Sequence, residues 1–196
     1  MTLPRSEAPT TAIPPALTLA ILSLLLAFVG TCGSLLLSLG LGLKACPLCF
    51  YQRSFVMAAF AIFGLGVFSE RNRPGLVCLL NVPLVWAGLG VAAFHEYLVL
   101  ADVLECPRAL FGIGTAPAQS LALFASLAVV TSLGAWCGRG ESSRQGMSTL
   151  VFAIILGVLM AAASVKSSPP LPPKPIGPYD PIKQPLDMCR PVFRGS

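Results

Sequence analysis

Long apolar stretches, separated by short polar links, make up most of this chain. Five of these stretches carry almost no charged residue, and they cover residues 17–43, 50–68, 76–100, 120–137 and 149–165. A helix that spans a bilayer needs roughly 17–25 apolar residues, and inside lipid a helix satisfies its own backbone hydrogen bonds. The pattern therefore predicts an all-α, polytopic membrane bundle with five transmembrane helices.

The composition agrees with a membrane location and excludes other classes of protein. Charged residues make up 11% of the 196 residues, whereas soluble domains carry about 25%. The net charge of +5 is spread thinly, so no basic patch indicates binding to nucleic acid. The first apolar stretch is longer than the roughly 7–15 apolar residues of a cleaved signal peptide. We therefore expect it to remain in the protein as a helix.

The cysteines indicate which side of the membrane each link faces. With five spans, four of the seven cysteines fall on one side, namely Cys46, Cys49, Cys106 and Cys189. Basic residues divide evenly between the two sides, so the positive-inside rule does not decide the orientation. Disulfides persist outside the cytosol, which favours an extracytoplasmic position for these cysteines and a cytoplasmic N-terminus. The alternative is that they share a side by chance, because unpaired cysteine is a common buried residue.

The two cysteines of "CPLC" stand where the first outer link should turn into the second helix. Pro47 suits the first turn of a helix, and the partial positive charge of a helix N-terminus favours the reactive thiolate form of a nearby cysteine. Arg53 lies four residues after Cys49, on the same helix face, and always keeps its charge. Cys49 is therefore the better candidate for a stabilised thiolate. The alternative for Arg53 is a side chain that only extends to the lipid headgroups.

A zinc site is the competing interpretation of this cysteine pair. Its partners would be Cys106, Cys189 and His95. Structural zinc sites usually bring a second short-spaced pair of ligands, and this sequence has none, so we expect no metal. His95 also has a plainer interpretation, as an interfacial histidine bonded to a neighbour such as Glu96.

Three stretches carry a resemblance to a known family. "CPLCFYQR" at 46–53 resembles the C-x-x-C-x-Y-x-R signature of the disulfide-bond-formation protein B (DsbB) family. "GLGVAAFHEYLVLADVLEC" at 88–106 resembles that family's third helix, with a histidine near its outer end and a cysteine in the loop that follows. "APAQSLALFASL" at 116–127 resembles the start of its fourth helix. The resemblance covers residues 17–137.

The family consists of membrane thiol oxidases, which pass electrons from a thioredoxin-like dithiol protein to a quinone. The resemblance implies that Cys46 and Cys49 are the pair next to the quinone, which would be ubiquinone or menaquinone, and that Cys49 contacts it. It implies that Arg53 stabilises the charge of the thiolate and the quinone, and that His95 lies near the same pocket. Cys106 matches the loop cysteine that the partner protein attacks.

The sequence departs from the family pattern after Cys106. The family keeps a second cysteine in this loop, and the loop here has none. The family fold has four helices, and this chain adds a fifth and a tail with nine prolines between Pro169 and Pro191. Such a tail favours polyproline II, at about 3.1 Å per residue, so it could extend on the order of 60 Å. We therefore predict that Cys189 reaches back to form a disulfide with Cys106. The alternative is a disordered tail with an unpaired cysteine.

These expectations combine into one hypothesis about organisation and function. Residues 1–16 would be a cytoplasmic segment, 17–137 a DsbB-like four-helix core, 138–165 a cytoplasmic link with the fifth helix, and 166–196 an extracytoplasmic tail. The protein would reoxidise a thioredoxin-like partner in the bacterial cytoplasmic (inner) membrane and pass the electrons to a quinone. The alternative is a non-catalytic membrane subunit of a larger complex, which uses its tail to bind a partner.

Overall fold

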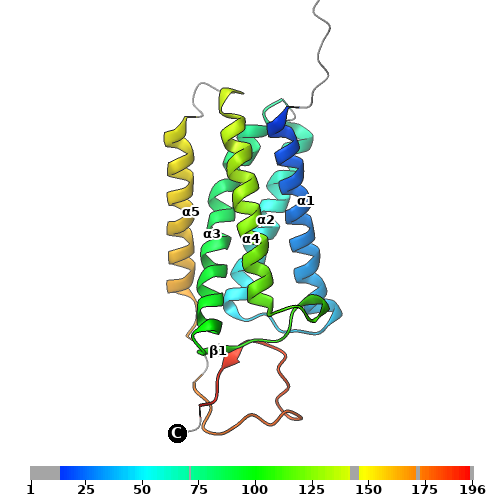
Figure 1. Cartoon of the computed structure of the whole chain (residues 1–196), viewed down its shortest axis with the longest axis vertical. Coiled ribbons are helices and arrows are strands. Elements are labelled where there is room, and N and C mark those ends of the chain that lie inside the picture. The colour runs from blue at the N-terminus through cyan, green and yellow to red at the C-terminus, as the bar shows by residue number, and fades with distance from the viewer. Residues whose placement is uncertain (1–13, 71, 142–145, 171–172, 195–196) are drawn as a thin grey trace, which may run out of the picture.

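The computed structural model describes residues 14–70, 72–141, 146–170 and 173–194. In these residues five long helices stand side by side, and the chain after the fifth lies against one end of the bundle (Figure 1). The helices are α1 (Pro15–Leu35), α2 (Pro47–Ser69), α3 (Pro74–Leu100), α4 (Ala116–Cys137) and α5 (Met147–Ser167). All five are long and apolar enough to cross a membrane. The predicted fold class, an all-α membrane bundle, is confirmed.

The helix starts follow from the residues at the ends of the polar links. Proline stands in the first turn of α1, α2, α3 and α4, where its missing N–H had no partner in any case. Two of these helices also have a side-chain cap. Cys46 accepts a hydrogen bond from the backbone N–H of Cys49 at the start of α2, and Thr115 accepts one from Ala118 at the start of α4. Capping satisfies an otherwise unpaired donor, and it holds the Cys46 sulfur at the N-terminus of α2.

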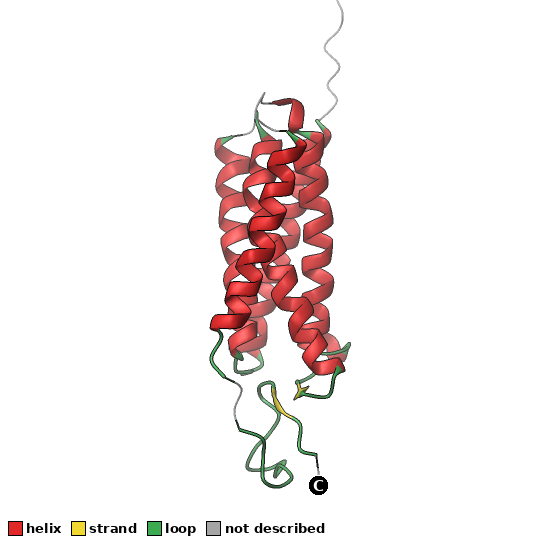
Figure 2. Cartoon of the chain, turned by 90° about the vertical axis from the view of Figure 1, so that its left-hand side faces the viewer, coloured by secondary structure: helices red, strands yellow, loops and turns green. Residues whose placement is uncertain are grey.

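Helix α3 is the centre of the bundle. Within its most apolar segment 50% is buried, against 17% for α5. It packs against α2, α4 and α5, and the helices run along a common direction (Figure 2). Gly88 lets α4 approach closely, since a Cβ atom at this position would lie 2.0 Å from the ring of Phe124. Small residues at helix contacts are typical of membrane bundles, where close packing replaces the hydrophobic effect.

The first apolar stretch, residues 17–43, does not form a single regular helix. Helix α1 ends at Leu35 and continues as one turn of π-helix, Leu36–Gly40. The Arg53 side chain of α2 contacts this region. It donates hydrogen bonds to the carbonyl of Ser34 and to the hydroxyls of Ser34 and Ser38. The guanidinium thus binds backbone and side-chain groups around the π-helical turn, and such turns are frequent at functional sites.

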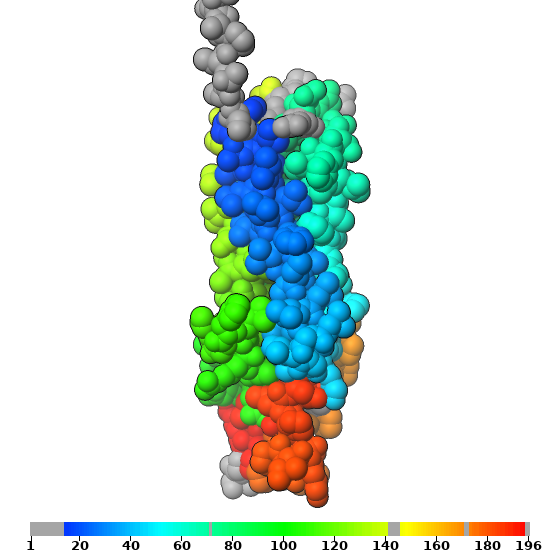
Figure 3. All heavy atoms as spheres, turned by 90° about the vertical axis from the view of Figure 1, so that its right-hand side faces the viewer, coloured from blue at the N-terminus to red at the C-terminus, as the bar shows by residue number. Residues whose placement is uncertain are grey.

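The tail folds back against the bundle. A short strand in it, β2 (Arg190–Pro191), pairs antiparallel with β1 (Leu104–Glu105), which follows α3. Arg190 forms an ion pair with Glu105 at 2.5 Å and lies 3.6 Å over the ring of Tyr179. In Figure 3 the orange and red atoms of the tail close the end of the bundle. The described part of the tail is therefore docked, and the alternative of a disordered tail is wrong for it.

Replacing Gly88 by alanine should destabilise the bundle, because the new methyl group would overlap the buried ring of Phe124. Overpacking of this kind costs about 1–3 kcal/mol, and we expect a loss of that order in the free energy of unfolding in detergent. Gly64→Ala is the matched control, since a Cβ atom there meets nothing within 4 Å. Equal unfolding midpoints for the two variants would contradict this account of the packing.

Candidate functional site

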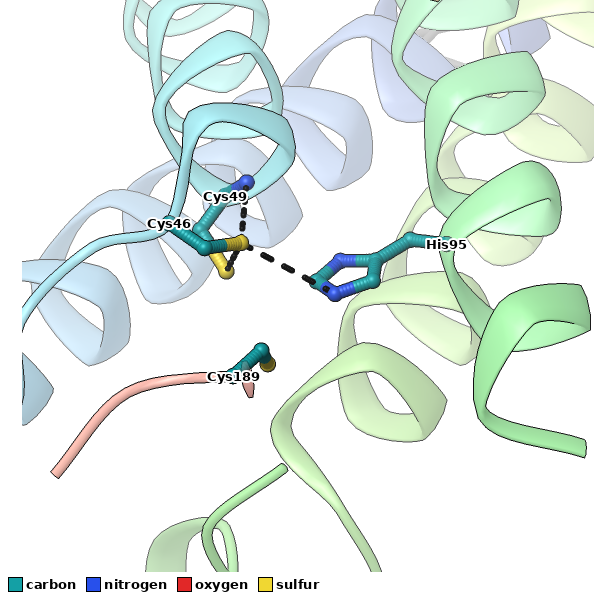
Figure 4. A group of neighbouring side chains, drawn as sticks. All are labelled: Cys46, Cys49, His95 and Cys189. Atoms are coloured by element: carbon teal, nitrogen blue, oxygen red, sulfur yellow. Dashed lines mark hydrogen bonds between the residues drawn. The ribbon is translucent and has the colours of Figure 1, made fainter. Parts of the chain in front are cut away.

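The candidate site lies at the end of the bundle that carries the tail. Three segments meet there: the start of α2, the C-terminal end of α3, and the tail around Cys189. Figure 4 shows Cys46, Cys49, His95 and Cys189 converging from these segments. The four predicted catalytic cysteines and His95 are therefore brought together, although they are spread over more than half of the sequence.

Cys46 and Cys49 occupy the start of α2. Their sulfur atoms are 2.9 Å apart, and the structure holds both residues as thiols. The backbone N–H of Cys49 donates to the Cys46 sulfur at 3.3 Å. Only 5% of Cys46 is exposed. A small rotation of either side chain would allow an S–S bond, so the predicted disulfide between them stays a prediction for the oxidised protein.

The surroundings of Cys46 favour its thiolate. The hydrogen bond between the two thiols holds the pKa of Cys46 well below that of an ordinary thiol. Burial opposes this effect, while His95 and the backbone N–H of Cys49 add to it. Donors thus converge on the helix-capping Cys46 sulfur, a feature that the sequence analysis did not predict. The predicted thiolate at Cys49 stays a prediction, and the Arg53 guanidinium is held by Ser34 and Ser38.

The second cysteine pair is a disulfide between Cys106 and Cys189, as predicted. The bridge joins the loop after α3 to the tail, across 83 positions of the sequence. Cys189 is buried, whereas Cys106 is half-buried. The Cys189 sulfur also lies within 4.8 Å of the sulfurs of Cys46 and Cys49. The tail therefore supplies the cysteine that the loop lacks, and places it against the first pair.

His95 is fully buried between the two cysteine pairs. Its Nε2 atom lies 3.8 Å from the Cys46 sulfur and 3.7 Å from the Cys106 sulfur. Its Nδ1 atom is 3.3 Å from the side-chain amide nitrogen of Gln52. Glu96, the alternative partner named from the sequence, instead accepts a hydrogen bond from Thr115 at 3.5 Å. His95 thus contacts the cysteine sulfurs and Gln52, and the predicted alternative of a bond to Glu96 is wrong.

A cavity of about 240 Å³ opens beside the first cysteine pair. Its walls come from α1, the π-helical turn, α2 and the start of α4, and they are mostly apolar. The polar groups that face it include Cys49, Gln52, Arg53 and Gln119. His95 lies outside the cavity lining, so its predicted role in cofactor binding stays a prediction.

The cavity residues fit a quinone. A quinone ring needs apolar walls, and its carbonyl oxygens need donors or positive charge. Leu37, Val56 and Phe124 supply apolar surface, and the Arg53 guanidinium supplies the charge. Cys49 would be the sulfur in contact with such a ring, because it alone of the first pair lines the cavity.

The same cluster has the spacing of a possible metal site. One ligand atom from each of Cys46, Cys49, His95 and Cys189 lies within 4.8 Å of the other three. Zinc would need these sulfurs as thiolates, and the Cys189 sulfur is bonded to Cys106. With that bridge closed, the arrangement favours exchange between two cysteine pairs as the chemistry of the cluster.

Two polar residues of the site were missed by the sequence analysis. Gln52 contacts His95, and the hydroxyl of Ser120 donates to the amide oxygen of Gln52 at 2.7 Å. The available signal was a glutamine next to Arg53 in an apolar helix, since polar residues inside membrane helices commonly mark functional sites.

Comparison with known proteins agrees with this geometry. Residues 16–167 match the family described as disulfide bond formation protein DsbB. No curated protein and no solved structure matches the chain. The matched segment runs from the second residue of α1 to the last residue of α5. It therefore includes the fifth helix and leaves out the tail that carries Cys189. Because the match covers more than half of the sequence, this chain belongs to the DsbB family of disulfide-forming membrane proteins.

Proposed function

We propose that the protein is a thiol oxidase that reoxidises a thioredoxin-like dithiol protein and passes the electrons to a quinone. One observation carries this proposal. The Cys106–Cys189 bridge lies against the Cys46–Cys49 pair, and Cys49 in turn faces an apolar cavity with Arg53 in its wall. The disulfide that would receive electrons, the cysteine pair that would relay them and the cavity for the acceptor are thus next to one another.

The first steps are thiol–disulfide exchanges, in which one S–S bond forms as another breaks. A partner thiolate attacks Cys106, which is the more exposed sulfur of its bridge, and Cys189 leaves as a thiolate. The Cys189 thiolate attacks Cys46 of an oxidised Cys46–Cys49 bond, and Cys49 leaves as a thiolate. The partner's second thiolate then displaces Cys106, and Cys106 in turn displaces Cys46 from Cys189. The partner ends with a disulfide, and Cys46 and Cys49 end reduced.

The cavity residues serve the last part of the reaction. A quinone, when bound, supplies the two-electron acceptor that the cysteines themselves cannot supply. Arg53 is held in place by Ser34 and Ser38, so its charge is fixed in the cavity wall before any ligand arrives. Fixed charge in an apolar site stabilises developing negative charge without reorganisation.

Cys49→Ser should abolish quinone reduction by the purified protein with a reduced thioredoxin-like protein, because serine cannot form or break the S–S bond. The measurement is the loss of quinone absorbance with time. Cys137→Ser is the matched control, since Cys137 is exposed at the other end of α4 and its variant should retain the wild-type rate. A wild-type rate in Cys49→Ser would overturn the assignment of Cys49. No turnover in the wild-type protein would favour the non-catalytic subunit.

Cys189→Ser should distinguish the function of the Cys106–Cys189 bridge from that of the Cys46–Cys49 pair. We expect loss of turnover with the protein partner, because the exchangeable bridge at Cys106 is gone. Slow turnover with a small dithiol should remain, because such a molecule can reach Cys46 and Cys49 directly. The two rates are measured by the same quinone assay. Full turnover with the protein partner would mean that Cys106 acts alone or with Cys46.

We also propose that the tail faces the extracytoplasmic side of a bacterial cytoplasmic membrane, because a disulfide persists there and not in the cytosol. Lys174→Cys introduces a thiol at an exposed position of the tail. A membrane-impermeant maleimide should label it in intact cells, and should label Cys137 only after permeabilisation. The reverse pattern would invert the proposed orientation.

A further inference from the structure

Three polar side chains form a hydrogen-bonded series that ends at His95, in the centre of the site. The hydroxyl of Ser120, on α4, donates to the amide oxygen of Gln52 on α2 at 2.7 Å. The amide nitrogen of Gln52 is then turned towards Nδ1 of His95 on α3, at 3.3 Å. Gln52 is 5% exposed and His95 is 0% exposed, so both side chains depend on these contacts and not on water.

The order of donors and acceptors in this hydrogen-bonded series decides which ring nitrogen of His95 carries the proton. An amide N–H can only donate, so Nδ1 must accept and therefore bears the lone pair. In a neutral imidazole the other nitrogen then carries the hydrogen. Ser120 stabilises this state, because its hydroxyl occupies the amide oxygen and keeps the amide nitrogen towards the ring. The Nε2–H group is thereby fixed.

The Nε2–H group is directed at one sulfur from each cysteine pair. Cys46 lies at 3.8 Å and Cys106 at 3.7 Å. These are the two sulfurs that leave as thiolates in the last two exchange steps proposed above, while Cys189 is the sulfur that passes between the pairs. A hydrogen bond from a neutral N–H to a thiolate is charge-assisted and stronger than one to a thiol or a disulfide.

We propose that His95 is a catalytic hydrogen-bond donor that stabilises the departing thiolates of Cys46 and Cys106. Gln52 and Ser120 are positioning residues that keep the proton on Nε2. This inference rests on the proposed thiol exchange between the two pairs. The ring does not release its proton in the step. An S–S bond forms at the attacked sulfur, the old S–S bond breaks, and the electron pair stays on the leaving sulfur, which the N–H group stabilises.

The other titratable or charged groups near the His95 ring are either reacting sulfurs or are hydrogen-bonded elsewhere. The titratable groups that face it are the sulfurs of Cys46, Cys49, Cys106 and Cys189. The neighbouring Glu96 is bonded to Thr115. The Arg53 guanidinium is bonded to Ser34 and Ser38.

The test measures exchange between the cysteine pairs in the full-length protein, without quinone and without a protein partner. A small dithiol reduces the Cys106–Cys189 bridge of oxidised protein, and timed alkylation with peptide mapping follows the appearance of thiols at Cys46 and Cys49. The rate at which these thiols appear in Cys189→Ser measures direct reduction of Cys46–Cys49 by the dithiol, and this rate is subtracted. His95→Leu should slow this transfer on the order of ten- to a hundred-fold, the effect of removing a hydrogen bond to a charged group. His95→Gln should recover part of the rate, because its amide N–H can reach the position of Nε2–H.

Variants at Gln52 test the positioning role. Gln52→Met keeps the side-chain length but removes the donor to Nδ1, and it should slow transfer severalfold. Gln52→Glu replaces the donor by a carboxylate that can only accept, which draws a proton to Nδ1 and removes it from Nε2 unless the ring is doubly protonated. The transfer rate of Gln52→Glu, divided by that of the wild-type protein at each pH, should therefore rise as the pH falls. Ser126→Ala, on the outer face of α4, is the control for Ser120→Ala, which should slow transfer less than Gln52→Met does.

The outcomes separate this inference from the proposed function. If wild-type protein transfers no reducing equivalents between the pairs, the proposed function itself is wrong. If wild-type protein transfers them and His95→Leu does so equally fast, the role of His95 is overturned. If His95→Leu is slow but the rate ratio of Gln52→Glu is independent of pH, the positioning role of Gln52 is overturned. Formation of the Cys106–Cys189 bridge in each isolated variant shows that it has folded.

Discussion

The covalent bond between Cys106 and Cys189 joins two distant segments at the end of the bundle that carries the tail. It fixes the loop after α3 to the tail, and the β1–β2 pairing and the ion pair between Arg190 and Glu105 lie beside it. The same bond brings the Cys189 sulfur within 4.8 Å of both sulfurs at the start of α2. Two cysteine pairs from distant parts of the sequence therefore form one cluster, and the chemistry of the site depends on that proximity.

The position of the site follows from the different demands of lipid and water on the backbone. Irregular backbone is tolerated at membrane depth only where the protein itself satisfies its polar groups. Here the irregular segments, the π-helical turn and the loops that follow α1 and α3, are gathered at one end. Arg53 binds the first of these segments through Ser34 and Ser38. The bundle thus combines regular helices along most of its length with a polar, partly irregular end that contains the reactive sulfurs.

Much of this organisation could be predicted from the sequence. The five helices follow from apolar runs of membrane-spanning length. The Cys106–Cys189 bridge follows from counting spans together with the resemblance to the DsbB family, whose second loop cysteine this chain lacks. The break in the first run could not be predicted, because Leu36–Gly40 is as apolar as the residues before it. The break coincides with contacts from Arg53, which lies 19 positions after Ser34. The two hydrogen bonds that lead to His95 were missed for a similar reason. Gln52 lies 43 positions before His95, and Ser120 lies 68 positions after Gln52.

The location of Cys189 downstream of α5 has a consequence for biogenesis. During synthesis Cys106 emerges 83 positions before the sulfur that completes its bridge. The bridge can close only after α5 and the segment that carries Cys189 have been synthesised, and only when that segment lies at the same end of the bundle as Cys106. A nascent or prematurely terminated chain can therefore contain all five helices and yet lack this bond. Formation of the Cys106–Cys189 bond thus depends on complete synthesis of the chain and on docking of the tail.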